Sequence, residues 1–411
     1  MIIFNREFLF TIIFILANLH VLRNISLIFL APYFFLIFFF TLSTFQFRLK
    51  INFNTRYFLL LSFFICQWLY VIVISAYSLN FIDLVNSTSR LLYSLLFFLS
   101  LLVNLYLFDN ESFFERIIKI YLFFTSIASA FLIFQYFFGP IDFFHAHAGR
   151  GGLIRYSTSL GAITVYGVVV GLSIPLLLII KSNVYRFLLL IIFILGALFS
   201  LQKAAVANIF LSIFFLFILY KASLTKKLLF LLIIIVVSSF IATIFFNDYL
   251  LVNLNIMGIG SGALFTGESL DTDLFRRLNG SYIPSIPPIQ YFIGLGFIGG
   301  GGVYGVENGI MAHSQFFEML LLGGPLFLLA YMFIIFIPLL KIYRVNSKYF
   351  STKNISLIVF FIMFVINSFV FGGMLINPSI SLIFYFILCY SYVAYFRSST
   401  SPGIQVKSIN K

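Results

Sequence analysis

Long apolar runs recur along the chain and are separated by short polar segments. An α-helix needs roughly 20 mostly apolar residues to cross the hydrocarbon core of a bilayer. Counting such runs predicts about twelve membrane-spanning helices, with almost nothing between the seventh and the eighth. The predicted spans are 7–22, 25–45, 57–78, 88–108, 117–138, 158–180, 186–201, 203–220, 228–246, 313–340, 355–372 and 379–396.

Composition points to the same class of protein. The chain is 62% hydrophobic and 9% charged, and its mean hydropathy is +1.12. Soluble domains are nearer half apolar and a quarter charged, so a soluble fold is excluded. We therefore expect an all-α polytopic membrane protein, with residues 1–411 forming a single integral membrane domain. The first apolar run lacks a small-residue cleavage site after it, which favours a retained first span.

Lysine and arginine predict the orientation, because cytoplasmic loops carry an excess of both. With the N-terminus inside, 18 of the 25 basic residues fall on the cytoplasmic side and 7 on the outer side. The C-terminal segment 397–411 is then a cytoplasmic tail. The net charge of +13 reflects this bias and does not indicate nucleic-acid binding. The outer basic residues are Arg23, Arg90, Arg150, Arg155, Lys203, Arg276 and Arg277.

Two outer loops are distinctive. One is 139–157; the other is the long segment 247–312 between spans nine and ten, which holds 13 of the 26 glycines. So much glycine predicts a partly irregular backbone, and loops of this length are usually functional or disordered. His145 and His147 lie in the first loop, but two ligands are too few for a metal site. The two cysteines lie in apolar runs, so we expect no metal and no cofactor.

Several chemically active residues come just before or at helix starts that face outward. Helix N-termini carry partial positive charge and attract anions, phosphates above all. Histidine is the side chain best suited to take a proton near neutral pH. The pattern predicts an outward-facing site in which basic residues hold an anionic leaving group and a histidine deprotonates a hydroxyl. The residues are Arg150, Arg155, Lys203, Arg276, Arg277 and His313.

Each of these residues also has a purely structural interpretation. Lys203 can extend to the interface, and Arg150 with Arg155 can anchor ordinary lipid headgroups. Arg276 and Arg277 can pair with the nearby loop acids Asp271 and Asp273. His313 can be a polar residue at a helix start with no chemical role. The interiors of the spans are nearly free of charge.

Four segments in order resemble the O-antigen ligase and Wzy-type polymerase superfamily. In "AHSQFFEMLLLGGPLF", His313, Ser314 and Gly324 match the family's histidine motif, and Phe327 departs from it. "RYSTSLGAITVYG" is similar to a second motif through its arginine, threonine and two glycines, without the usual Pro-Asn. "SLQKAAVAN" resembles the family's "S-R-G-A" helix start, with Lys203 in place of arginine. In "RRLNGSYIPSIPPIQYFIGLGFIGG" the arginines precede a "P-x-x-G-x-G" element.

The resemblance implies a metal-independent inverting glycosyltransferase of the bacterial inner membrane, with its active site facing the periplasm. Donor and acceptor would be polyprenyl-diphosphate-linked oligosaccharides, and a chain-length regulator protein would be a further partner beside the membrane lipids. His313 would be the catalytic base, while Arg155, Lys203, Arg276, Arg277 and Arg150 would hold the diphosphate. Arginine can contact a phosphate through two points of a planar group, and lysine cannot. The contact of Lys203 with the diphosphate would therefore be weaker than that of an arginine.

Other functions fit parts of the pattern. A ligase that delivers the chain to lipid A–core shares the same chemistry. A flippase or transporter of lipid-linked sugars would show repeated halves and mid-membrane charges, and neither is visible here. A scaffold protein would not need basic residues at three helix starts. A peptidoglycan glycosyltransferase would use an aspartate in the large outer loop, for which Asp271 and Asp273 are the candidates.

Overall fold

The structure is a computed structural model that describes most of the chain but little of the long loop 247–312. The described residues are 6–18, 55–141, 147–150, 153–161, 164–200, 202–220, 288–298 and 314–396. The predicted spans 25–45 and 228–246 lie outside the described residues, as do the tail 397–411 and most of the loop 247–312.

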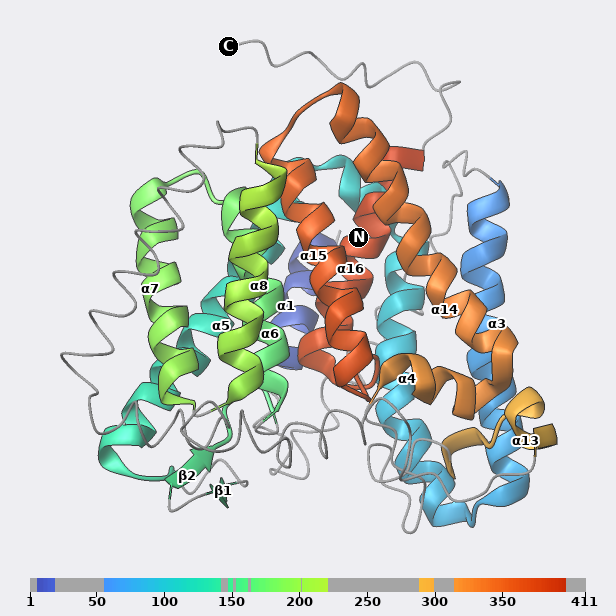
Figure 1. The fold of residues 1–411 in the computed structure, drawn as a ribbon. Helices are drawn as coiled ribbons and strands as arrows, with labels where there is room; N and C mark the ends of the chain where they lie inside the picture. The colour runs from blue at the N-terminus through green and yellow to red at the C-terminus, as the bar shows by residue number, and fades with distance from the viewer. Residues whose placement is uncertain are drawn as a thin grey trace, which may run out of the picture.

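Helices make up nearly all of the described structure (Figure 1). Five of them, α3, α5, α14, α15 and α16, are long and apolar enough to cross a membrane. This confirms a membrane-embedded helical protein, while the count of twelve spans stays a prediction. The α-helices are α1 (Arg6–Asn18), α3 (Thr55–Ser78), α4 (Phe81–Val103), α5 (Glu111–Phe138), α6 (Val165–Leu176), α7 (Asn183–Phe199), α8 (Lys203–Leu219), α13 (Pro288–Ile293), α14 (Gln315–Lys348), α15 (Thr352–Val370) and α16 (Pro378–Phe396), with 3-10 turns at Leu105–Asp109 and Leu177–Ile179.

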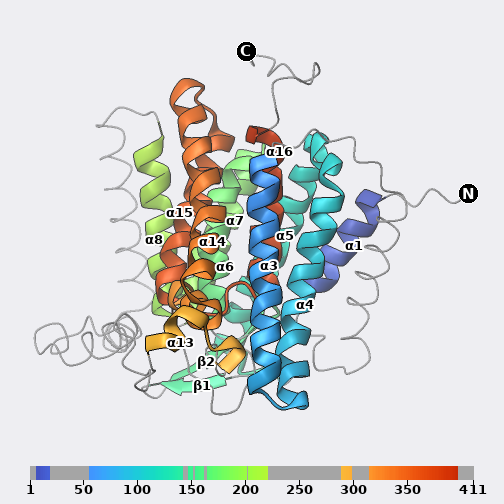
Figure 2. The same ribbon diagram turned by 90° about the vertical axis from the view of Figure 1, so that its right-hand side faces the viewer.

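The loop 139–157 contains a feature that the all-α prediction missed. Strands β1 (His147–Arg150) and β2 (Leu153–Tyr156) form a two-stranded antiparallel hairpin. Figures 1 and 2 place this hairpin and α13 at the same end of the bundle, opposite the end of α16. We call it the hairpin end. Helices α4, α6, α8, α14 and α16 all begin there, which is the grouping that the predicted alternation of spans requires.

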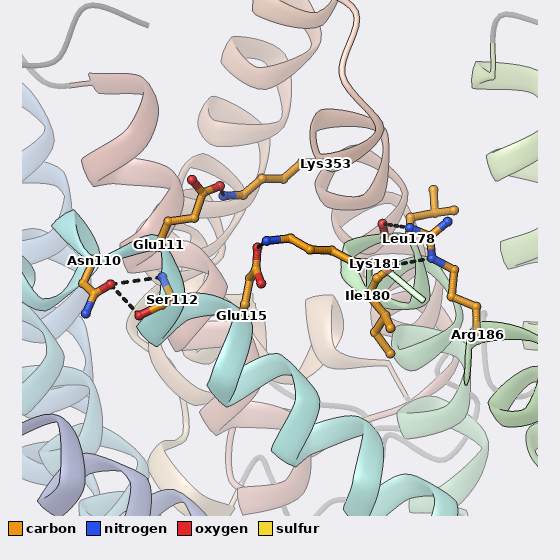
Figure 3. Close-up of polar contacts among 9 residues, drawn as sticks. All are labelled: Asn110, Glu111, Ser112, Glu115, Leu178, Ile180, Lys181, Arg186 and Lys353. Carbon is orange, nitrogen blue, oxygen red and sulfur yellow. Dashed lines mark hydrogen bonds and ion pairs between the residues drawn. The ribbon is translucent and has the colours of Figure 1, made fainter. Parts of the chain in front are cut away.

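The opposite end carries paired charges and is called the ion-pair end. Glu111, at the start of α5, accepts a hydrogen bond from Lys353 of α15 at 2.8 Å, and Lys181 lies 3.3 Å from Glu115 (Figure 3). Both lysines were predicted to face the cytoplasm. The structure places these helix ends at the same end of the bundle. Which side of the membrane each end faces stays a prediction.

Aromatic rings fill the middle of the bundle and hold α16 in its centre. The Phe114 ring of α5 stacks on Tyr390 of α16 with centroids 3.8 Å apart. Phe364 of α15 stacks on Phe384 at 4.0 Å. Such pairs contribute about 0.5–1.5 kcal/mol each beyond the area that they bury. Helix α16 is therefore a central element of the bundle, and it packs against α1, α4, α6 and α14.

Helices α6 and α8 run parallel and pack very closely through two glycines. A Cβ on Gly167 would lie 3.0 Å from the backbone nitrogen of Ala205, and one on Gly171 would lie 2.7 Å from Cβ of Asn208. The carbonyls of these glycines accept hydrogen bonds from Asn208 Nδ2 at 2.9 Å and from Ser212 Oγ at 2.8 Å. Small residues four apart permit this approach between membrane helices. The contact fixes where α8 begins relative to α6.

The helix boundaries differ from the predicted spans in several places. Helix α5 begins at Glu111 and not at residue 117, α6 begins at Val165 and not at residue 158, and α14 runs to Lys348 and not to residue 340. The fourth span was expected to begin at residue 88, but α4 begins at Phe81, so Arg90 lies well inside the helix and not near its start. The tenth span was expected to be one uninterrupted run, yet α14 contains a kink with non-helical backbone at Gly323 and Gly324. Gly324 has φ +74°, a conformation that side-chain-bearing residues rarely adopt. Apolar periodicity alone does not reveal such a break.

Candidate functional site

The hairpin brings the two arginines of the loop 139–157 onto one face. Arg150 pairs in register with Leu153, and Arg155 pairs with Ala148. Residues opposite each other in an antiparallel pair share a face, as do residues two apart on one strand, so Arg150 and Arg155 occupy diagonal positions on the same face. Diagonal neighbours lie about 7–8 Å apart.

The turn after the hairpin is attached to the start of α16. Thr158 and Gly161 form a short antiparallel bridge, with Gly161 N–H donating to the Thr158 carbonyl at 3.1 Å. Gly161 has φ +121°, which explains why glycine is needed there. Ser379 Oγ, at the start of α16, donates to the Leu160 carbonyl at 2.9 Å. The motif "RYSTSLG" therefore builds a fixed turn between the hairpin and α6.

Lys203 is the first residue of α8, as the sequence predicted. The residue before it, Gln202, caps the helix only through its backbone and makes no side-chain capping bond. Gln202 is buried, and within the described part of the chain neither polar atom of its side chain has a hydrogen-bond partner. The close approach of Gly167 keeps α6 against this first turn. The start of α8 therefore combines a basic residue with an unsatisfied amide.

His313, Arg276 and Arg277 lie outside the described residues. Ser314, the residue after the histidine, is described. Ser314 precedes α14 and is buried, and its Oγ donates to the Ser368 carbonyl of α15 at 3.1 Å. Asn367, the residue before Ser368 in α15, accepts a hydrogen bond at Oδ1 from Asn208 of α8 at 2.8 Å. Consecutive residues at the end of α15 thus anchor the starts of α8 and α14.

The first turn of α14 carries two polar residues that sequence reasoning missed. Gln315 and Glu318 are fully buried. Gln315 Oε1 accepts from the Met374 N–H at 2.6 Å, and Glu318 Oε2 accepts from the Gly373 N–H at 2.7 Å. They hold the turn between α15 and α16. The available signal was an acid five residues after His313 within an otherwise apolar run, since an ionisable residue inside a membrane helix is a functional candidate by default.

The hairpin end therefore gathers the described parts of the predicted site. It holds the strands of Arg150 and Arg155, the first residue of α8, and the N-terminal end of α14. Backbone N–H groups at helix starts favour anions. Hydroxyl and carboxamide groups around them bind neutral polar ligands. Such a set can hold a negatively charged leaving group beside a substrate that carries many hydroxyls.

Comparison with known proteins adds no assignment. No family model and no curated protein matches this chain. The proposed function therefore rests on residue chemistry and on the arrangement of the helix starts.

Proposed function

We propose that the protein is an inverting glycosyltransferase that polymerises polyprenyl-diphosphate-linked oligosaccharide repeat units on the outer face of the bacterial inner membrane. Its products would be O-antigen or capsule chains. One observation carries the proposal: neighbouring residues at the end of α15 contact both α8, which Lys203 opens, and Ser314, which follows His313. This connection supports a single site in which the basic residues that hold the diphosphate, called the clamp below, act together with the base His313.

The reaction assigns a separate task to each part. Arg150, Arg155 and Lys203, with Arg276 and Arg277 of the long loop, hold the diphosphate of the donor. His313 takes the proton from an acceptor hydroxyl. The hydroxyl oxygen forms a bond to the anomeric carbon of the donor sugar, and the bond from that carbon to the diphosphate oxygen breaks. The electron pair leaves with the diphosphate, whose charge the clamp stabilises.

A glycan ladder on a gel tests the proposal. Cells that lack the gene are complemented with the wild type, His313→Ala or Arg155→Ala, and protein levels are compared. We expect single repeat units on lipid A–core without the gene, full ladders with the wild type, and none with His313→Ala, because proton removal from the acceptor fails. Lys181→Ala is the matched control, since it removes an exposed basic residue at the ion-pair end.

The outcomes separate the alternatives. Long chains that stay on the carrier lipid in the deletion strain would identify a ligase. Repeat units that remain on the cytoplasmic face would identify a flippase. Normal ladders with His313→Ala at wild-type protein level would remove this residue as the base. A ladder that does not depend on the gene would contradict the proposed function altogether.

A further inference from the structure

Gln202 is a buried carboxamide that the fold itself does not use. Gln202 is 4% exposed, and neither Nε2 nor Oε1 has a hydrogen-bond partner among the residues that the structure describes. Its backbone, in contrast, is satisfied: the N–H donates to Ser200 Oγ at 3.2 Å, and the carbonyl accepts from Ala205 N–H at 3.1 Å. The side chain does not cap α8, although it precedes that helix directly. Gln202 thus contributes its backbone to the fold and leaves its amide free.

A free buried amide calls for an explanation. Buried polar side chains in native proteins nearly always have a partner, and those without one often mark a functional site. A leucine has a similar size and would fill this position without leaving a donor and an acceptor unsatisfied. Ser159, which is 5% exposed and lies in the turn between the hairpin and α6, has a hydroxyl that also lacks a partner among the described residues. Both groups lie at the hairpin end, next in the chain to segments of the proposed clamp.

The two free atoms of Gln202 indicate the chemistry of the ligand. Nε2 needs an acceptor and Oε1 needs a donor. The oxygens of an ionised diphosphate only accept, so they would satisfy Nε2 alone. A sugar hydroxyl or an acetamido group both donates and accepts, and can satisfy the whole carboxamide. The free amide therefore fits a sugar better than a phosphate.

The position of Gln202 identifies which sugar. In the donor, the first sugar is joined through its anomeric carbon directly to the diphosphate. A side chain adjacent to the diphosphate clamp therefore meets this sugar before any other. We propose that Gln202 binds a hydroxyl or acetamido group of the first sugar of the lipid-linked donor. This inference rests on the proposed function, because that function places the diphosphate at Lys203, the next residue in the chain.

Binding to two lipids tests the assignment without requiring turnover. The full-length protein in lipid nanodiscs is titrated with bare polyprenyl diphosphate and with polyprenyl diphosphate that carries one N-acetylhexosamine. We expect the wild type to bind the sugar-bearing lipid roughly tenfold or more tightly, since a site that hydrogen-bonds a polar group discriminates against ligands lacking it. In Gln202→Leu this ratio should fall to near one, with the affinity for the bare lipid unchanged.

Asn354→Leu is the matched control. Asn354 is a buried carboxamide at the ion-pair end, and it has partners in Tyr349 and Tyr395. This variant should unfold at a lower temperature than the wild type but keep the affinity ratio. Gln202→Leu should unfold at the same or a higher temperature, because it removes an unsatisfied amide. A loss of the ratio in Gln202→Leu alone therefore supports a binding role.

The remaining outcomes overturn the inference in distinguishable ways. An unchanged ratio in Gln202→Leu would mean that the amide does not contact the sugar. An equal loss of affinity for both lipids would move its contact to the diphosphate and contradict the sugar assignment. If the wild type binds neither lipid, the proposed function fails, and the inference fails with it.

Discussion

At the ion-pair end of the bundle, Lys181 and Lys353 are paired with acids, whereas at the hairpin end the buried side chains of Gln202 and Ser159 have no hydrogen-bond partner among the described residues. Lys181 and Glu115 illustrate the first arrangement, and the lysine side chain is 84% exposed. Gln202 illustrates the second. The two ends contain polar residues of similar kinds, but they use them differently.

The difference between exposed ion pairs and buried unpartnered groups bears on where the proposed site lies. Exposed ion pairs cost little to form and contribute about 0–1 kcal/mol each. They serve here as surface links between neighbouring helix ends. Buried groups without partners reduce stability, so they persist in natural proteins mainly where a ligand or a reaction needs them. The unpartnered side chains of Gln202 and Ser159 therefore support the hairpin end as the location of the proposed site.

The largest expected effect comes from a buried polar contact at the hairpin end. Asn208 donates both to the Gly167 carbonyl and to Asn367 Oδ1, and it is 5% exposed. Asn208→Ala should lower the free energy of unfolding by about 2–3 kcal/mol, because it leaves buried acceptors unpaired and opens a small cavity. Thermal unfolding in detergent measures this change. A decrease in the free energy of unfolding as small as that expected for an exposed ion pair would contradict the difference proposed between the two ends.

An intermediate effect is expected at Glu318. Glu318→Leu leaves the Gly373 N–H without its acceptor and should cost about 1–2 kcal/mol. Glu318→Gln keeps an acceptor of the same length and removes a buried carboxyl, so no loss of stability is expected. Unfolding temperatures of both variants measured against the wild type test this pair. Equal destabilisation by Leu and Gln would show that the carboxyl group itself is required by the fold.

The smallest effect is expected at the ion-pair end. Lys353 pairs with Glu111 and also lies 4.5 Å from the centroid of the Tyr390 ring. Lys353→Met should lower the free energy of unfolding by about 0.5–1 kcal/mol, and less at high salt. Lys181→Ala, at the more exposed pair, should change the unfolding temperature by less. If Lys353→Met lowers the free energy of unfolding as much as Asn208→Ala does, buried polar contacts also stabilise the ion-pair end.

Several features followed from the sequence alone. The apolar runs predicted helices, and the structure confirms a membrane-embedded helical protein with a break between α7 and α8 at residues 200–202, where the separating segment is very short. Lys203 was expected at a helix start and lies there. These features are local, because length, hydropathy and the position of a charge at the end of a run determine them.

The polar contacts between distant segments required the tertiary structure. No periodicity pairs Asn208 with Asn367, which lie 159 residues apart. The hairpin was missed because its four-residue strands are too short to produce a clear alternation. The kink in α14 was missed because two glycines within an apolar run are also compatible with a continuous helix. Which polar groups remain unpaired also depends on all their neighbours at once.

The sequence by itself determined that the protein lies in a lipid bilayer, that it is helical, and that basic residues lie at predicted helix ends. Each of these features follows from the composition of a single segment. Only the tertiary structure decided that the starts of α8 and α14 share an anchor at the end of α15, and that the buried amide of Gln202 has no partner in the described part of the chain. The reason is that burial and hydrogen bonding are properties of contacts between segments. A sequence specifies those contacts only through the complete fold.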